Sequence, residues 1–184
     1  AVSPEDRIRI IALPSIGMQY ADRAIRRLFV EVPAACPIRS DDVRWAFSGV
    51  RITAPNAGEI LLAPAEENAM LRHYGFERTA RVYRSVTPVA LPEKYARLCS
   101  RKTGAEFSLV LDHAKSGVIQ ALRHANIGAR VESIRLQREP FDARGKMAAE
   151  FSEGTRFREE RLWHVEITFD EPVEGPLLLG GGRF

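Results

Sequence analysis

Residues 106–124, EFSLVLDHAKSGVIQALRH, form the longest periodic segment of the chain, and ARVESIRLQR follows at residues 129–138. Apolar residues recur at helical spacing in the first segment, which predicts an amphipathic helix that ends near Asn126 and Gly128. The second segment alternates: Val131, Ser133 and Arg135 oppose Glu132, Ile134 and Leu136. Alternation of this kind predicts a strand, so the centre of the fold is a helix followed by a strand.

The segments on either side extend this pattern. Residues 78–90, RTARVYRSVTPVA, predict a long strand or one with a bulge near Pro88, and LWHVEITF at 162–169 predicts another. Residues 139–158 are polar without a clear period and predict a long loop. The order strand, helix, strand, strand is that of a βαββαβ ferredoxin-like unit whose last strand is replaced by the glycine-rich end GPLLLGGGRF.

The amino-terminal half predicts a second, less regular set of elements. Strands are expected at 7–13, 24–32 and 59–63, and one or two helical turns at 66–74. Ser40 is the expected N-cap of a short helix that ends at Gly49. The predicted fold is therefore α+β, with tandem ferredoxin-like (RRM-like) domains at 1–77 and 78–184, antiparallel sheets and a C-terminal glycine-rich loop. Trp45 and Trp163 fit apolar patterns and are expected in the core.

Charge is unevenly distributed along the 184 residues. The formal net charge is +3, but residues 72–138 alone carry +8, whereas residues 1–71 carry −1 and residues 139–184 carry −4. Of the 27 basic residues 23 are Arg, the side chain that suits bidentate phosphate recognition, although a GC-rich genome gives the same bias. The basic block is consistent with a polyanion-binding surface or with a solvated mixed surface.

Several classes of protein are disfavoured. No apolar run approaches the roughly 18 residues that span a bilayer, and no signal-peptide pattern precedes the first strand. Cys36 and Cys99 lack metal-binding spacing and suggest free thiols in a reducing cytoplasm. No His, Cys or acidic residues show metal-ligand spacing, so neither a metal nor a cofactor is expected. The start at Ala indicates a processed product or a piece of a longer polypeptide.

Six ordered strings carry a resemblance that runs over nearly the whole chain. They are RIRIIALPSIG, AIRRLFVEVP, DDVRWAFSGV, RVYRSVTPVALP, ALRHANI and LWHVEITFDEPVEGPLLLGGGRF. Together they resemble the carboxyl-terminal, repeat-processing half of the fused subunit of type I-G (I-U) CRISPR effectors, in the RAMP superfamily. This resemblance implies paired ferredoxin-like folds, a glycine-rich loop that touches RNA, and metal-independent cleavage of precursor CRISPR RNA within the repeat.

Metal-free RNA cleavage needs a base for the 2′-hydroxyl, an acid for the leaving 5′-oxygen, and cations for the phosphorane. The loop after PSIG holds Tyr20 beside Arg27, and there we expect the scissile phosphate. His73, in LRHYGF near a predicted turn, is the expected proton-transfer histidine. The other three histidines fit structural or solvated positions: His113 on a helix face, His124 at a helix end and His164 within a strand.

The expected RNA contacts come from five places in the sequence: the loop after PSIG, the start of the 24–32 strand, the 129–138 strand, the long loop and the glycine-rich end. They are Arg23, Arg26, Arg135, Arg138, Arg144, Lys146, Gly180, Gly181, Gly182 and Arg183. Glycine lets backbone N–H groups approach a phosphate closely. Tyr83 and Phe141 are candidates to stack on unpaired bases, with core or loop packing as the alternative.

Two other functions compete with the endoribonuclease. The family carries histidine after PSIG, whereas this chain has Met18-Gln19-Tyr20. That difference favours a non-cleaving RNA-binding subunit that holds the 3′ repeat hairpin of the guide within a type I effector. The third possibility is an assembly protein whose basic sheet binds another subunit. The expected partners are therefore CRISPR repeat RNA and other effector subunits, without a membrane and in the cytoplasm.

Overall fold

The chain divides into two compact units whose boundary falls between Met70 and Leu71. The computed structural model describes residues 3, 6–16, 26–54, 58–67, 69–91, 104–153 and 155–179. Helix α2, Ala69–His73, spans this boundary. Ile16 belongs to the second unit, although the residues before it belong to the first. The boundary predicted at residue 77 stays a prediction.

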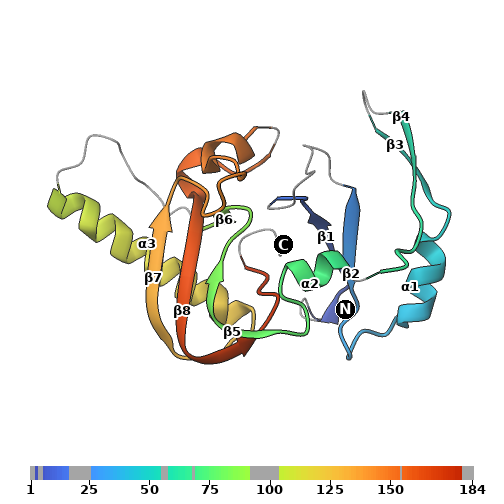
Figure 1. The fold of residues 1–184 in the computed structure, drawn as a ribbon, viewed down its shortest axis with the longest axis horizontal. Helices are drawn as coiled ribbons and strands as arrows, with labels where there is room; N and C mark the ends of the chain where they lie inside the picture. Colours follow the sequence, from blue (N-terminus) through green and yellow to red (C-terminus); the bar gives the residue numbers. More distant parts are fainter. Residues whose placement is uncertain are drawn as a thin grey trace. The chain divides into compact units, whose positions relative to one another are not determined.

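Among its described residues, the first unit contains two separate antiparallel strand pairs, helix α1 and the start of α2 (Figure 1). Strand β1, Arg9–Leu13, pairs with β2, Arg27–Glu31, and an ion pair of 2.9 Å joins Arg9 to Glu31 at the end of the register. Strands β3, Arg51–Ala54, and β4, Gly58–Leu61, form the other pair. The alternation predicts β4 but not β3, because RITA is too short to show a period of its own.

Helix α1, Ser40–Phe47, corrects two sequence-based expectations. Its N-cap is the extended residue Arg39, without a side-chain capping bond, so the expected N-cap Ser40 is instead the first helical residue. The expected stop is present, because Gly49 adopts a φ of 77° that suits glycine. Trp45 was predicted in the core but is 81% exposed, since Val43 marks the buried side of this short helix.

The second unit is built on a four-stranded antiparallel sheet whose central strand is β8, Leu162–Glu174. Strand β7, Val131–Gln137, pairs with β8 along one edge, and β5, Thr79–Arg84, pairs with it along the other. Strand β6, Val89–Ala90, continues the β5 edge. The long predicted strand is thus interrupted after Ser85, whose amide still donates to Val165, before Pro88 removes a donor.

Helix α3, Gly104–His124, packs across one face of this sheet, as Figure 1 shows. Alternate residues of β8 meet it: Trp163, Val165, Ile167 and Phe169 are all 2% exposed or less. The helix contributes Ala114, Val118 and Leu122 to the same core. It ends at His124, and Asn126, two residues later, adopts a φ of 58° near the predicted end. The core prediction for Trp163 is therefore confirmed.

The segment between β7 and β8 covers part of the opposite face of the sheet. It contains two short 3-10 helices, η3, Ala148–Phe151, and η4, Glu159–Arg161, within the loop predicted at 139–158 and just after it. A second apolar cluster joins Ala90, Ala148 and Leu162 beneath Phe151 and Phe157. The structure is therefore α+β with antiparallel sheets, and the order β5-β8-β7 around α3 is compatible with a ferredoxin-like arrangement.

We expect the core of the second unit to depend on Phe169, which is fully buried in β8. Replacing Phe169 with Ala should lower the free energy of unfolding by about 3–5 kcal/mol, because the substitution leaves a cavity between sheet and helix. Urea denaturation followed by circular dichroism measures this loss. The matched control is Phe107→Ala on α3, where 45% of the side chain is exposed and the loss should stay below about 1 kcal/mol. Equal losses in the two variants would contradict the assignment of the core.

Candidate nucleic-acid site

His73 lies at the carboxyl end of α2, where its imidazole contacts the entrance of the loop after PSIG. Its Nε2 is 3.1 Å from the carbonyl oxygen of Ile16, four residues before Tyr20. A carbonyl only accepts hydrogen bonds, so Nε2 carries the hydrogen of the neutral ring and Nδ1 keeps a lone pair. The side chain is exposed. His73 is thus arranged as a proton acceptor that solvent or a ligand can reach.

Tyr74 continues this cluster on the next residue. Its ring meets the His73 ring edge to face, with centroids 5.0 Å apart and planes at 71°. Burial raises the pKa of the Tyr74 hydroxyl, the charge of Asp142 adds to the rise, and a backbone hydrogen bond with Ile16 opposes it. The phenol therefore stays protonated at neutral pH and can donate a hydrogen bond or a proton.

The turn after α2 meets the end of strand β8. Phe76 forms a β-bridge with Gly175, and the Gly175 amide donates to the carbonyl of Arg78 over 2.9 Å. A Cβ at Gly175 would lie 3.0 Å from the Gly75 carbonyl and 3.0 Å from the Tyr83 ring, so only glycine fits without displacing backbone. Beyond this contact Leu177 and Leu179 pack against the core.

Three distant segments of sequence therefore converge in the second unit. They are Ile16 in the turn after β1, the turn at 73–76, and Gly175 directly after β8. The predicted residues Tyr20, Arg23, Gly180, Gly181, Gly182 and Arg183 lie outside the described residues. Among the described candidate residues of this region, His73 is the one that contacts Ile16, four residues before Tyr20.

Arg26 and Arg27 belong to the first unit, at the start of β2. Both residues are exposed, and Arg27 pairs in register with Leu13 of β1. Their expected roles at a scissile phosphate stay predictions.

Arg138 has structural partners that the sequence did not reveal. Its guanidinium carbon lies 3.7 Å from the centroid of the Trp163 ring. The same group donates to the carbonyls of Glu159, Glu160 and Leu162, the first two over 2.7 and 3.1 Å. Burial lowers the pKa of this guanidinium, and the charges of Glu159 and Glu160 oppose the shift. Arg138 therefore anchors the η4 turn to the sheet; its predicted RNA contact stays a prediction.

Arg144 and Lys146 occupy the loop after β7, as the sequence predicted. The Arg144 amide donates to the Asp142 carboxylate over 2.8 Å, and its side chain is exposed. The Lys146 ammonium lies 3.8 Å from Glu150, and 45% of its side chain is exposed. At that distance and exposure the Lys146 ion pair adds little stability, which leaves the ammonium available to an anion.

The two aromatic candidates have different surroundings. Tyr83 packs edge-on against Phe169 and donates its hydroxyl hydrogen to the Val173 carbonyl, so it is a partly buried residue that packs against the core. Phe141 lies under the guanidinium of Arg135, 5.7 Å from the ring centroid. Arg135 is exposed. The structure thus brings together Arg135 and Phe141, which the sequence analysis placed in two separate elements.

His164 is fully buried on the loop-covered face of the sheet. Its Nε2 is 2.9 Å from the Lys146 carbonyl, whereas Nδ1 has no hydrogen-bond partner within the described residues. The expectation of a satisfied strand histidine thus holds for one ring nitrogen only. Burial lowers the pKa of His164, while the Lys146 hydrogen bond, the nearby Ser85 backbone and the charge of Glu139 oppose the shift. The Ser85 backbone does not meet the geometry of a hydrogen bond to Nδ1.

Neither the described residues nor known proteins identify a metal, a membrane contact or a relative for this site. Within the described ranges, no group of three or more His, Cys, Asp or Glu residues is placed to hold a metal ion. None of the described helices is long and apolar enough to cross a membrane. Comparisons with protein-family models, with curated proteins and with solved structures find no match for this chain.

Arg138 and Arg135 allow a matched test of structural against surface roles. Arg138→Gln should lower the free energy of unfolding by about 2–3 kcal/mol, because it removes charge-assisted hydrogen bonds to three backbone carbonyls, of which that of Leu162 is partly buried. Arg135→Gln, three residues earlier and within β7, should cost less than about 1 kcal/mol because that side chain is exposed. Urea denaturation compares the two variants. Similar stabilities would contradict the anchoring role of Arg138.

The pH dependence of stability should reveal His164. Because burial lowers its pKa in the folded state, the unfolded chain binds the extra proton as the pH falls below about 6.5. Stability is therefore full above that pH and is lost below it, by at most about 1.4 kcal/mol per pH unit. Urea denaturation between neutral and mildly acidic pH should show this slope in the wild type and in His113→Gln. His164→Gln should flatten it, and an unchanged slope in that variant would refute the assignment.

Proposed function

We propose that this chain is a CRISPR-associated RNA-binding endoribonuclease domain that cleaves precursor CRISPR RNA within the repeat without a metal ion. The resemblance of six ordered strings to the processing half of type I-G effectors supplies the hypothesis. One structural observation carries it further. The expected proton-transfer residue His73 meets both the entrance of the Tyr20 loop and, through Phe76, the segment that leads to the glycine-rich end.

The proposed reaction uses the 2′-hydroxyl of the repeat as the nucleophile. His73 takes the proton from that hydroxyl, and the oxygen attacks the adjacent phosphorus in line. The bond from phosphorus to the 5′-oxygen breaks, and Tyr20 protonates this leaving group. The products are a 2′,3′-cyclic phosphate and a free 5′-hydroxyl. Arg27 stabilises the charge of the phosphorane.

Further cations and glycines hold the RNA in this proposal. Arg144 and Lys146 are exposed on the loop after β7 and suit phosphate contacts. Gly180, Gly181 and Gly182 offer backbone amides to a phosphate beside Arg183, and Arg23 and Arg26 extend the basic surface. The corresponding fold is a tandem pair of ferredoxin-like domains, and the antiparallel α+β architecture supports it.

The proposed protein partners are other subunits of a cytoplasmic type I effector complex. Support comes from exposed apolar side chains in the first unit, where Trp45 is 81% exposed and Leu61 is 62% exposed. Exposed apolar side chains mark a protein interface where they gather into a contiguous patch. This observation fits assembly as well as RNA processing, because one subunit of an effector would do both.

The alternative function is a non-cleaving RNA-binding subunit that holds the 3′ repeat hairpin of the guide. The Met18-Gln19-Tyr20 sequence favours it, because tyrosine is a weaker general base than histidine at neutral pH. In this alternative the same contacts grip the hairpin, and the proton-transfer role of His73 is absent.

Cleavage of labelled repeat RNA in EDTA distinguishes the two functions. The enzyme should make one discrete cut and leave a cyclic phosphate. His73→Ala should slow this cut by about 10²–10⁴-fold, the usual contribution of a general base, while binding changes by less than about twofold. Tyr20→Phe should also slow the cut, and His113→Ala, an exposed histidine on α3, is the matched control.

The outcomes of this assay are separable. Tight, salt-sensitive binding of RNA that stays intact would replace the enzyme by the binding subunit. Equal cleavage rates in His73→Ala and His113→Ala would remove His73 from the mechanism. Absence of binding at low salt would overturn both functions.

A further inference from the structure

One face of the β5-β8-β7 sheet packs against α3, but the opposite face is only partly covered. Alternation along β8 places Glu166 and Thr168 on this second face, opposite to the buried Val165, Ile167 and Phe169. At one end of the face the segment after β7 packs on Leu162, and the Lys146 carbonyl bonds to His164. The covered part of this face ends at His164, which pairs with Gln137 of β7.

The remaining part forms an open sheet face made of two cross-strand rows. The register aligns Arg84 and Arg135 on either side of Glu166, and Val82 and Ser133 on either side of Thr168. Val82 is 47% exposed, and 62% of the Arg84 side chain is exposed. Antiparallel sheets commonly keep one face on the core and the other in solvent, and these two rows belong to the solvent-facing side.

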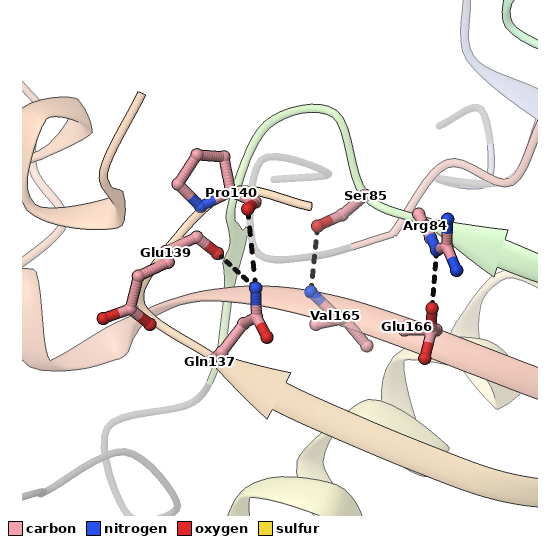
Figure 2. Close-up of polar contacts among 7 residues, drawn as sticks. All are labelled: Arg84, Ser85, Gln137, Glu139, Pro140, Val165 and Glu166. Carbon is pink, nitrogen blue, oxygen red and sulfur yellow. Dashed lines mark hydrogen bonds and ion pairs between the residues drawn. The ribbon is translucent and has the colours of Figure 1, made fainter. Parts of the chain in front are cut away.

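In the row of Arg84, Glu166 and Arg135, only one of the two arginines forms an ion pair with the glutamate. Arg84 Nε lies 2.5 Å from Glu166 Oε2, as Figure 2 shows, so this guanidinium is neutralised and held in place. No carboxylate among the described residues forms an ion pair with Arg135. Its guanidinium instead lies over the Phe141 ring. The row therefore keeps one unneutralised positive charge next to an aromatic ring.

The open sheet face suits an unpaired nucleotide better than a duplex. Duplex binding without base contacts relies on many phosphate contacts, and a single unneutralised guanidinium supplies few. An arginine stacked on an aromatic ring offers instead a flat surface on which any base can stack. Glu166 and Thr168 add hydrogen-bond acceptors, and Ser133 adds a hydroxyl. The open sheet face can therefore also form hydrogen bonds with a base edge.

We propose that the open sheet face binds an unpaired segment of RNA, with one base stacked on the Phe141–Arg135 pair and the next base edge at Arg84. Glu166 is a positioning residue that orients Arg84. This inference rests on the proposed function only in taking RNA as the ligand. It assigns the single-stranded RNA beside the repeat hairpin to the open sheet face. This surface is separate from the corner at His73, where Ile16, His73, Phe76 and Gly175 meet.

Binding of three RNA probes to the full chain tests this assignment. The probes are a repeat hairpin without a tail, the same hairpin with an unpaired tail, and an unstructured polyuridine strand. Arg135→Gln and Phe141→Leu should each weaken binding of the tailed hairpin and of polyuridine by about tenfold, the scale of losing one base-stacking contact. Binding of the tail-less hairpin should change by less than about twofold.

Arg123→Gln is the matched control, because Arg123 is an exposed arginine of the same basic block on α3, the helix that packs on the opposite sheet face. It removes the same charge and should leave all three affinities within about twofold of the wild type. Photocrosslinking from thiouridine in the tail should mark the peptide that contains Phe141. Thermal unfolding shows whether each variant is folded.

The results separate this inference from the proposed function. Equal losses in Arg123→Gln and Arg135→Gln, or equal losses with and without the tail, would overturn the open sheet face as a binding site. So would a stacking-deficient but folded Phe141→Leu with wild-type affinity and crosslinks elsewhere. If polyuridine binds in a Phe141-dependent manner while the hairpin is neither bound nor cut, the inference stands and the proposed function fails.

Discussion

The second unit depends on the pairing of one strand with three others. Strand β8 hydrogen-bonds with β5 and β6 on one side and with β7 on the other, so every ladder of the sheet includes it. Its alternation then separates two environments. One set of side chains forms the core with α3, and the other set faces the covering segment and the open sheet face. Core and candidate surfaces are consequently fixed by the same register.

The two candidate surfaces use different physical means. The corner at His73 is made by backbone contacts: a carbonyl from Ile16 fixes the imidazole, and a bridge from Phe76 fixes the start of the tail. The open sheet face is made by side chains across strands, with one arginine neutralised by Glu166 and the other laid on Phe141.

Local patterns predicted the elements well where one face is buried. The apolar stripe of residues 106–124 and the alternation of 162–169 correspond to α3 and to the first part of β8, because burial imposes the period. The patterns failed where little is buried. Trp45 was expected in the core of a unit whose short helix buries Val43 alone, and the β3 strand was missed. At the site, the sequence selected His73, but no local pattern could join it to Ile16, 57 residues away.

The contrast between the two tryptophans has a practical consequence. The chain has two, and each unit contains one: Trp45 is 81% exposed in the first unit, and Trp163 is 2% exposed in the second. Indole emission shifts to the red in water and to the blue in an apolar interior, and a soluble quencher reaches only an exposed ring. The intrinsic fluorescence of the unmodified protein therefore carries two resolvable signals, one for each unit, and reports the melting or ligation of either without an added label.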